Sequence, residues 1–347
     1  MTRISARSLP DAAAAFRADP RWRGGDDAYS VVLPDGRRLW LFGDTFVARA
    51  GGHRRDATFI HNSVAVQAAG SDLAPGALAF RWREDEHGPR SFLPDRADGS
   101  YLWPGDAAVV DGRLVLFAMV THDRPAAEVD HAVETLTFFA SDDWTALLVE
   151  DPSGDPLGWE LVELERPAMP FAPLVGSAGV VVHDGFLHAH AVDYPAAHVC
   201  RWPVEDVVRG DLSSPRWWVA DRGWVPTDEL TGPPTVTIAD GETEFTVHRL
   251  DDGRFLQVQM SGLDDPRFLL RTADAPQGPW SEPVAVAHRP VDAGRDDRFC
   301  YAGKAHPGLG RGGLVLTHNA IPLTLDAIRE HTDLYWPRVV EVDVWAV

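Results

Sequence analysis

The chain is poor in lysine and cysteine and has no long apolar run. Among its 347 residues, Lys304 is the single lysine, and Cys200 and Cys300 are the two cysteines. The cysteines lie far apart, outside any CxxC or Cys/His cluster, which excludes a disulfide scaffold and a structural zinc site as organising elements. No apolar run approaches the roughly 20 residues that span a bilayer, so we expect no membrane partner.

Positive charge is also scarce relative to negative charge. The 52 Asp and Glu against 32 Lys and Arg give a formal net charge of −20. Such a chain repels a phosphate backbone, so a nucleic-acid partner is not expected. The segment from Met1 to Trp22 lacks a basic stretch followed by an apolar one, so no signal peptide is visible and we expect a cytoplasmic protein.

Turn-forming residues and tryptophan are abundant. The chain has 30 Gly, 27 Pro and 13 Trp, with few long helical patterns. This composition predicts an all-β fold with many turns. Two short helices are expected, at 11–17 and 325–331.

One hairpin pattern recurs along the chain. An apolar strand, a tight Asp-Gly turn and a second apolar strand appear in YSVVLPDGRRLWLFGDTF, AAVVDGRLVLFAMVTH, AGVVVHDGFLHAHAVDY and EFTVHRLDDGRFLQVQMSG, and HPGLGRGGLVLTHNA has a Gly-rich turn instead. Asp-Gly supplies the positive φ angles that a two-residue hairpin turn requires. The turn glycines are Gly36, Gly112, Gly185, Gly253 and Gly313, at spacings of 60 to 76 residues.

A repeat of this length leaves room for four strands. Additional strands are expected at 63–67, 135–140, 198–202 and 268–272. The pattern predicts a five-bladed β-propeller, with four-stranded antiparallel blades around a central channel. We expect one domain over 1–347, with blades at 24–100, 101–170, 171–232, 233–298 and 299–347. The strand at 338–344 would pair with the N-terminal chain and close the ring, which removes exposed edges.

Propeller geometry places the start of each first strand and the end of each second strand at one mouth of the channel. The residues expected there are polar and mostly ionisable. They are Asp26, Asp27 and Asp44 from the first hairpin; Trp103, Asp106 and His122 from the second; Ser177, His190 and Asp193 from the third; Glu244 and Gln259 from the fourth; and Lys304, His306, His318 and Asn319 from the fifth. Of the first two, Asp27 is the less expected to point inward.

Several carboxylates around one cavity raise one another's pKa through repulsion and desolvation. A raised acid beside an ionised carboxylate is the equipment of general acid–base catalysis. Lys304 could offset the negative charge, hold one carboxylate ionised or bind an anionic substrate group. Trp103 and Trp22 are candidates for stacking on a sugar.

Parts of the sequence resemble a known family. GGDDAYSVVLPDGRRLWLFGDTF followed by HNSVAV is similar to the opening blade of five-bladed propellers long described as a domain of unknown function, whose relatives include endo-D-arabinofuranase glycoside hydrolases. The similarity continues through YLWPGDAAVV, GPWSEP, YAGKAHP, LVLTHN and YWPRVVEV. GPWSEP is found across propeller glycosidases, including arabinanase-like and fructosidase-like ones.

The resemblance implies a carbohydrate-active site at the channel mouth. Its first-blade motif points to Asp26 and Asp44, the second-blade motif to Asp106, and the HNS segment to His61 and Asn62. Glu244 rests on the ring of polar residues alone. The chain departs from arabinanase-like propellers at Gly176-Ser177-Ala178, where those proteins place a carboxylate.

The leading hypothesis is hydrolysis of a furanoside or another small glycoside. Asp106 or Glu244 would protonate the leaving oxygen, and Asp26 or Asp44 would act as base or nucleophile. Substrate-binding candidates are His61, Asn62, Trp103, His122, His190, Lys304, His306, His318 and Asn319. No cofactor is required, and the partner is a carbohydrate or another small molecule.

Two alternatives remain open. A propeller of this kind could bind a carbohydrate or metabolite without hydrolysing it, since fold does not determine function. It could also be a metal-assisted lyase, isomerase or biosynthetic enzyme, with His122, His190, His306 and His318 around a divalent cation in the channel.

Overall fold

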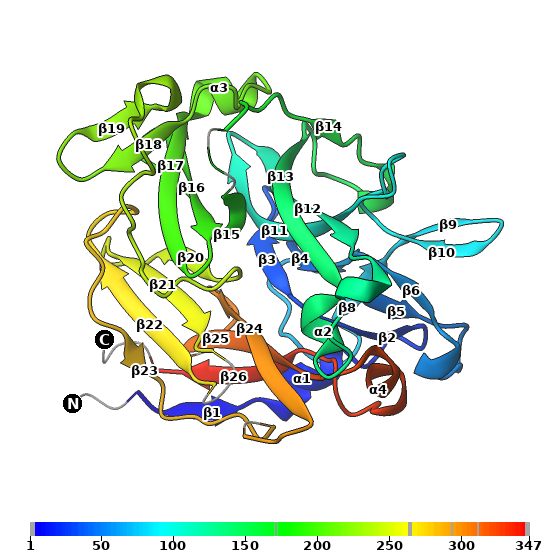
Figure 1. Ribbon diagram of the computed structural model, residues 1–347. Coiled ribbons are helices and arrows are strands. Elements are labelled where there is room, and N and C mark those ends of the chain that lie inside the picture. The colour runs from blue at the N-terminus through cyan, green and yellow to red at the C-terminus, as the bar shows by residue number, and fades with distance from the viewer. Residues whose placement is uncertain are drawn as a thin grey trace.

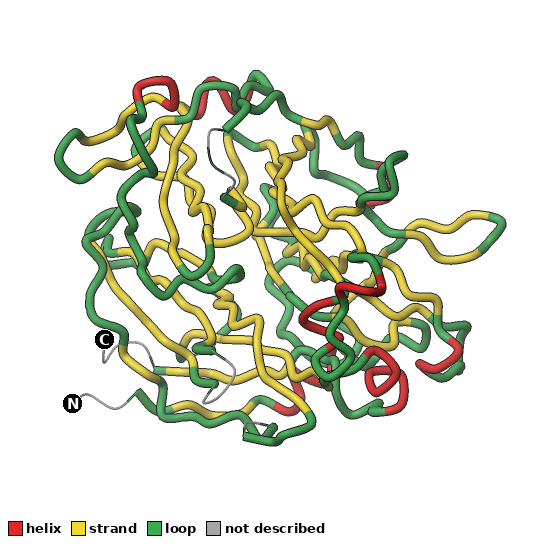
Figure 2. The backbone as a smooth tube through the Cα atoms, in the orientation of Figure 1, coloured by secondary structure: helices red, strands yellow, loops and turns green. Residues whose placement is uncertain are grey.

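Strands dominate the fold and helices are short and peripheral (Figures 1 and 2). The computed structural model describes residues 4–169, 171, 173–262, 266–292, 294–310 and 312–343. The all-β class expected from the sequence is confirmed, with several antiparallel sheets.

Within the described residues, five sheets have four or five strands each. The first contains β3 (Tyr29–Val32), β4 (Arg38–Phe42), β7 (Ser63–Gln67) and β8 (Leu78–Arg81). The second contains β11 (Tyr101–Val110), β12 (Arg113–Asp123), β13 (Phe139–Val149) and β14 (Val162–Glu163). The third contains β15 (Leu174–His183), β16 (Phe186–Asp193), β17 (Ala196–Pro203), β18 (Arg216–Val219) and β19 (Gly223–Pro226).

The remaining two large sheets come from the C-terminal part of the chain and from the N-terminus. One contains β20 (Thr246–Arg249), β21 (Phe255–Met260), β22 (Phe268–Ala273) and β23 (Val284–Ala285). The other contains β24 (Arg298–His306), β25 (Leu314–Pro322), β26 (Arg338–Val342) and β1 (Ala6–Ser8). Two smaller sheets are formed by β2 (Trp22–Gly25), β5 (Thr45–Val47) and β6 (Thr58–Ile60), and by β9 (Arg83–Asp85) and β10 (Gly88–Arg90). The α-helices are α1 (Pro10–Ala15), α2 (Glu134–Thr137), α3 (Val204–Val208) and α4 (Leu325–Glu330).

The large sheets lie around a common centre, with β3, β11, β15, β20 and β24 innermost (Figure 1). Direct hydrogen bonds join neighbouring inner segments: Gly179 N–H to Phe245 O at 2.9 Å, Ala305 N–H to Thr246 Oγ1 at 3.0 Å, and Ser30 Oγ with His306 Nδ1 at 2.7 Å. The strand at the C-terminus, β26, pairs with β1 near the N-terminus in the same sheet. Val344, the last residue of the strand expected there, lies outside the described residues.

Each recurring hairpin in the sequence forms an antiparallel strand pair, namely β3–β4, β11–β12, β15–β16, β20–β21 and β24–β25. Two of the Asp-Gly turns have positive φ at both central residues, 47° and 80° for Asp111-Gly112 and 49° and 76° for Asp184-Gly185. Such turns match the right-handed twist of the flanking strands.

The strand expected at 135–140 is wrong. Residues 134–137 form α2, and the strand β13 begins only at Phe139. Thr135 donates its N–H to Leu323 O at 3.1 Å and its hydroxyl to Pro322 O at 2.9 Å. This tertiary anchor holds the segment against the fifth sheet and overrides its local strand pattern.

Trp22 belongs to the core, so it is not available to stack on a sugar. Its side chain is fully buried, stacks on Phe80 with ring centroids 4.5 Å apart, and donates its N–H to Ser63 Oγ at 3.0 Å. Aromatic stacking and a satisfied indole N–H explain why so large a side chain is buried at this position.

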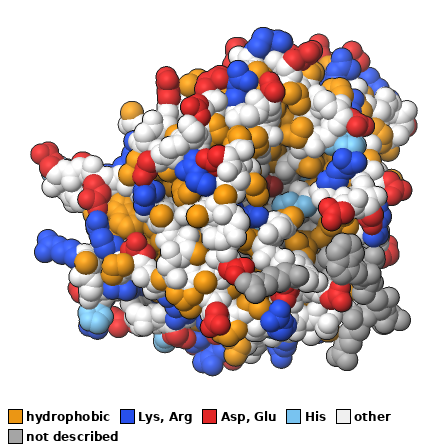
Figure 3. Space-filling model, turned by 180° about the vertical axis from the view of Figure 1, so that it is seen from behind, with side chains coloured by type: hydrophobic (Ala, Val, Ile, Leu, Met, Phe, Trp, Pro, Cys, Tyr) orange, Lys and Arg blue, Asp and Glu red, His pale blue; other side chains and the backbone are white. Residues whose placement is uncertain are grey.

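The surface is charged in both signs. Figure 3 shows acidic and basic side chains interspersed over the face opposite to that of Figure 1. Some surface charges form ion pairs, such as Arg81–Asp155 at 2.8 Å. Among the described residues, no helix is long and apolar enough to cross a membrane.

Gly176 lies where β15 lacks regular pairing with β16. A substitution at this position tests how tightly the sheets pack against each other. The φ of Gly176 is +71°, and a Cβ there would lie 2.2 Å from a ring carbon of Phe117. We expect Gly176→Ala to lower the free energy of unfolding by about 3 kcal/mol, from positive φ and overpacking together. Denaturant unfolding measures this value.

Gly112→Ala is the matched control, because its φ of +80° is similar but its Cβ would meet open space. It should cost only about 1 kcal/mol, the contribution of the backbone alone. Equal losses in the two variants would contradict a steric role for Gly176.

Candidate active site

A cavity of about 200 Å³ lies where the polar ends of several inner strands meet. The acidic residues that line it are Asp26, Asp27, Asp44, Glu242 and Glu244. They come from the segments before β3 and β20 and from the turn after β4. Trp103 of β11, Tyr301 of β24 and Tyr335 also line the cavity.

Asp26 is strongly affected by desolvation and by nearby negative charge. Burial, helped by the negative charge of Asp44, raises the pKa of Asp26 to about 8. The Tyr301 hydroxyl donates a hydrogen bond of 2.5 Å to Asp26 Oδ2 and opposes part of this rise. A Cβ at Gly43 would lie 2.7 Å from Asp26 Oδ1, so glycine leaves the room this carboxyl occupies. Asp26 therefore keeps its proton at neutral pH.

Asp44 has two side-chain partners, and both bonds go to Oδ1. Trp103 donates its indole N–H at 2.8 Å, and His61 Nδ1 lies 3.4 Å away. Burial outweighs these two partners and keeps the pKa of Asp44 above its usual value, although both partners lower it. Burial lowers the pKa of His61, but the Asp44 carboxylate outweighs burial and raises it overall. The two donors thus favour the ionised form of Asp44.

Lys304 is fully buried between two of the carboxylates. Its Nζ lies 2.8 Å from Asp27 Oδ1 and 2.7 Å from Glu244 Oε2, and 4.3 Å from the centre of the Tyr29 ring. Burial lowers the pKa of Lys304, but Asp27 and Glu244 outweigh burial and raise it. The ammonium group therefore stays charged and holds Glu244 at the cavity wall.

The backbone before β3 brings both of its aspartates to the cavity. Asp27 and Ala28 have φ of +70° and +59°, a left-handed conformation that non-glycine residues rarely adopt. This turn carries Asp27 into the lining beside Asp26. The sequence predicts that Asp27 points inward less than Asp26, and nothing in its local pattern reveals the turn.

Asp106 is not brought to the cavity. Its two carboxylate oxygens accept the backbone N–H groups of Ala107 and Val180, both at 2.8 Å. Burial raises the pKa of Asp106 to about 7, although both bonds oppose the rise. The side chain ties β11 to β15, which is a structural contact between two sheets.

The expected binding residues Asn62, His190, His306 and Asn319 are buried and bonded within the protein. Asn62 donates to Leu93 O and Leu102 O; His190 lies between Gly179 O and Pro276 O; His306 lies between Ser30 and Thr317; Asn319 donates to Gly25 O. Each of them secures neighbouring backbone or side chains rather than lining the cavity. Asn319 still acts close to the site, because Gly25 directly precedes Asp26.

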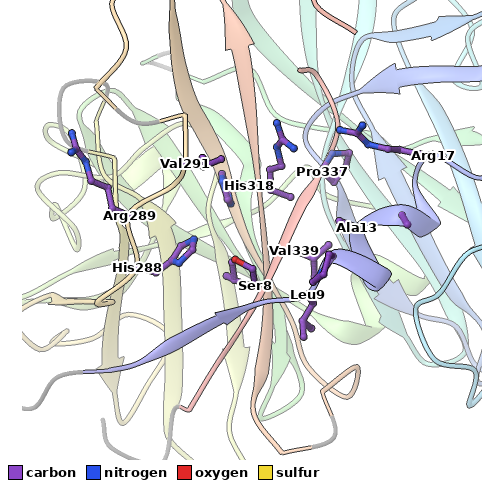
Figure 4. A pocket seen from close by; sticks show the side chains of 14 residues that line it. Ser8, Leu9, Ala13, Arg17, His288, Arg289, Val291, His318, Pro337 and Val339 are labelled. Atoms are coloured by element: carbon purple, nitrogen blue, oxygen red, sulfur yellow. The ribbon is translucent and has the colours of Figure 1, made fainter. Parts of the chain in front are cut away.

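His122 and His318 lie away from the cavity. The His122 side chain is 45% exposed, and its nearest acidic partner, Asp142, is 3.9 Å away. His318 lines a different pocket of about 460 Å³, with Leu9, Ala13 and Val339 among its neighbours (Figure 4). Among the described residues that line this second pocket there is no carboxylate, so it lacks the acid–base groups of the first.

These positions also bear on the metal hypothesis. The histidines proposed as ligands point to separate parts of the fold. In the part of the chain that the structure describes, no group of three or more His, Cys, Asp or Glu side chains is arranged to hold a metal ion.

Several residues of the cavity are not among those expected from the sequence. Tyr301 contacts Asp26, and the Tyr335 hydroxyl donates to Asp44 O at 2.9 Å. Both tyrosines lie in motifs that carry the family resemblance, YAGKAHP and YWPRVVEV, which was the available signal. Phe138 and Phe139 belong to the strand expected at 135–140. In the structure they directly follow α2 and line the cavity.

The fold is similar to that of several solved structures, among them glycoside hydrolases. A provisionally assigned hydrolase from Bacteroides ovatus ATCC 8483 is similar with a TM-score of 0.74 and 17% identity, over 98% of this chain and 90% of that one. The catalytic domain of the Coprinopsis cinerea GH62 α-L-arabinofuranosidase gives 0.52 and 13%, over 99% and 97%. The Xanthomonas citri GH43_1 enzyme, in complex with xylotriose, gives 0.50 and 16%, over 95% and 92%.

The chain belongs to the family described as "Domain of unknown function (DUF5005)", whose model matches residues 13–345. Among curated proteins, none matches the sequence.

The raised pKa of Asp26 can be tested through the pH dependence of the free energy of unfolding. The carboxyl is neutral in the folded protein up to about pH 8 but ionises near pH 4 when unfolded. Wild-type stability therefore falls as pH rises between these values. Asp26→Asn cannot ionise and avoids that loss. Its free energy of unfolding should rise relative to wild type by up to about 1.4 kcal/mol per pH unit in this window.

Urea unfolding at intervals from pH 4 to 9 measures the difference. Asp297→Asn is the control, since Arg298 and Arg295 hold the pKa of that exposed carboxyl below its usual range. Its difference from wild type should stay flat over the same window. A flat difference for Asp26→Asn would show that Asp26 ionises normally.

Proposed function

We propose that this chain is a five-bladed β-propeller glycoside hydrolase that acts on a furanoside or another small glycoside. The five large sheets support the blade count, since β3–β8, β11–β14, β15–β19 and β20–β23 each fall within one expected interval, and β24–β26 fall within the fifth except for Arg298, the first residue of β24. The observation that carries the activity is the pair Asp26 and Asp44, two carboxyl groups in one cavity with contrasting partners.

The two groups are suited to opposite roles. Asp26 has a raised pKa and holds a proton at neutral pH, as a general acid must. Asp44 receives hydrogen bonds from Trp103 and His61, which favour its anion. Pairs of carboxyls whose surroundings separate their pKa values are the usual source of acid and base in hydrolysis.

In the reaction we infer, Asp26 gives its proton to the glycosidic oxygen as the bond to the anomeric carbon breaks. The oxygen of a water molecule bonds to that carbon, directly or after Asp44 has attacked it, and the water's proton passes to a carboxylate. The products are the free sugar and an alcohol. Glu244, held by Lys304 at 2.7 Å, adds negative charge that stabilises the cationic transition state.

This proposal departs from the roles drawn from the sequence. There the acid was Asp106 or Glu244, and Asp26 was a base or nucleophile. Asp106 is engaged by two backbone N–H groups, and Glu244 by an ammonium group. Both contacts make proton donation to a substrate harder, whereas the hydrogen-bond donor to Asp26 is the neutral hydroxyl of Tyr301.

The substrate class is supported by the neighbours and by the cavity. The Coprinopsis protein is an α-L-arabinofuranosidase, and the Xanthomonas protein holds xylotriose. Both names concern pentose glycosides. Trp103 lines the cavity and offers an aromatic face of the type that packs against sugar rings.

Binding without hydrolysis is the second candidate. It is favoured by Ser177, at the position where arabinanase-like propellers place a carboxylate. Ser177 is buried and its hydroxyl donates to Leu174 O at 3.0 Å. Ligand affinity that is insensitive to Asp44→Asn, with no turnover, would support this reading.

Asp44→Asn tests the hydrolytic proposal. We expect kcat/KM on an aryl furanoside to fall by about 100- to 10,000-fold, the usual contribution of a positioned acid or base. The amide keeps an oxygen for the Trp103 bond, so the folded state should persist. A panel of aryl furanosides and pyranosides, with aglycone release as readout, covers the choice of sugar.

Asp142→Asn is the matched control, at an acidic residue with a 68% exposed side chain outside the cavity. It should keep wild-type activity. Wild-type activity in Asp44→Asn would remove Asp44 from the mechanism, and no release by the wild type would favour the binding alternative.

The pH dependence of activity provides an independent test of the acid. Because Asp26 must be protonated, kcat/KM of the wild type should fall about tenfold per pH unit above its pKa of about 8. Tyr301 lowers that pKa through its hydrogen bond. Tyr301→Phe should therefore move the alkaline limb to higher pH, and an unmoved or downward-shifted limb would assign it to another group.

A further inference from the structure

The cavity is apolar on the sides that the acidic residues leave open. Leu136, Phe138 and Phe139 come from the segment around α2, and Leu325 and Ile328 come from α4. The acid–base proposal uses none of these side chains. A sugar ring carries hydroxyl groups on most sides, and a buried hydroxyl needs a hydrogen-bonding partner. Apolar side chains offer no such partner, so a sugar ring alone does not complement this part of the cavity.

The two apolar segments are joined across the cavity. They come from the second and fifth large sheets, and α2 and α4 lie next to each other in Figure 1. Thr135 donates its N–H to Leu323 O at 3.1 Å, and Leu325 donates its N–H to Glu134 Oε2 at 2.9 Å. These bonds, from both helices, make a bridge that fixes the apolar side chains in place. We call residues 134–139 and 321–328 the apolar bridge.

The bridge also limits the size of what enters. The cavity measures about 200 Å³, below the roughly 300–1,000 Å³ that is usual for ligand pockets. A volume of this size favours a single sugar unit with one attached group over a run of several sugars. Leu136 keeps 37% of its surface exposed at this place, so apolar area is available for a ligand to cover.

We propose that the site takes a glycoside of one sugar unit whose aglycone is apolar. The sugar lies against Asp26, Asp44 and Trp103, and the aglycone lies against Leu136, Phe138 and Ile328 of the apolar bridge. The placement of the sugar rests on the proposed glycosidase function. The preference for an apolar aglycone rests on the side chains of the apolar bridge.

The test compares aglycones that differ in apolar area and not in leaving-group chemistry. S-methyl, S-butyl and S-hexyl thioarabinofuranosides, in both the D and L series, are resistant to hydrolysis and bind without turnover. Calorimetry on the wild-type protein gives their Kd values. Burying each methylene is worth about fourfold in affinity when complete, so we expect the hexyl compound to bind at least about 10-fold more tightly than the methyl one.

Two variants distinguish the contribution of the apolar bridge to binding from the effect of removing any partly exposed leucine. Leu136→Ala should reduce the ratio of methyl to hexyl Kd by about threefold or more. Leu157→Ala is the matched control, since Leu157 is 38% exposed and lies outside the cavity lining. It should leave the ratio unchanged, and both variants should unfold at the same denaturant concentration as wild type within error.

The outcomes distinguish this inference from the proposed function. Equal Kd values along the alkyl series, equal effects of the two alanine variants, or internal cleavage of an arabinan polymer would overturn it. Hydrolysis of aryl furanosides with no binding of any thioglycoside would also overturn it and leave the glycosidase proposal standing. Chain-length-dependent binding that Leu136→Ala weakens, without any aryl hydrolysis, would support the apolar site and remove the glycosidase.

Discussion

The arrangement of the site depends on one buried cation. Lys304 has no exposed surface, yet its ammonium group contacts Asp27 and Glu244 and lies over the ring of Tyr29. These groups come from three of the large sheets or the segments leading into them. Burying a charge is costly unless it is paired, so the lysine and the carboxylates each make the others' burial possible. Without this cation, gathering so many acids at one cavity would be opposed by desolvation and mutual repulsion.

Desolvation then gives neighbouring acids different properties. Asp26 has a phenol as its donor, and burial keeps it protonated to about pH 8. Asp44 has an indole and an imidazole as donors, which favour its anion. The apolar bridge contributes to the same effect from the other side, because excluding water strengthens every electrostatic interaction inside the cavity. The different pKa values of the two acids and the preference for an apolar aglycone thus have the same physical cause, which is the exclusion of water from the cavity.

Backbone strain is concentrated at the same place. Asp27, Ala28, Ala302 and Tyr335 are non-glycine residues with positive φ, between 56° and 70°. Asp27 and Tyr335 line the cavity, and Ala302 follows Tyr301. Such conformations persist only when surrounding contacts determine them, and they are common where a side chain must be aimed precisely at a ligand. Here they direct one carboxyl, Asp27, and two phenols, Tyr301 and Tyr335, toward one cavity.

The sequence by itself determined the all-β class, the recurring hairpins and the presence of Asp26, Asp44, Glu244 and Trp103 at the cavity. These features follow from local rules: strand periodicity, Asp-Gly turn chemistry and the position of polar residues at strand ends. Only the tertiary structure decided that Asp106, His190 and His306 are internal contacts, because that depends on which backbone groups face them from other sheets. It also decided the apolar bridge, since residues 134–139 become a cavity wall through hydrogen bonds to a segment 187 to 191 residues away in the sequence. Long-range partners of this kind leave no periodic mark in the chain, whereas turns and strands do.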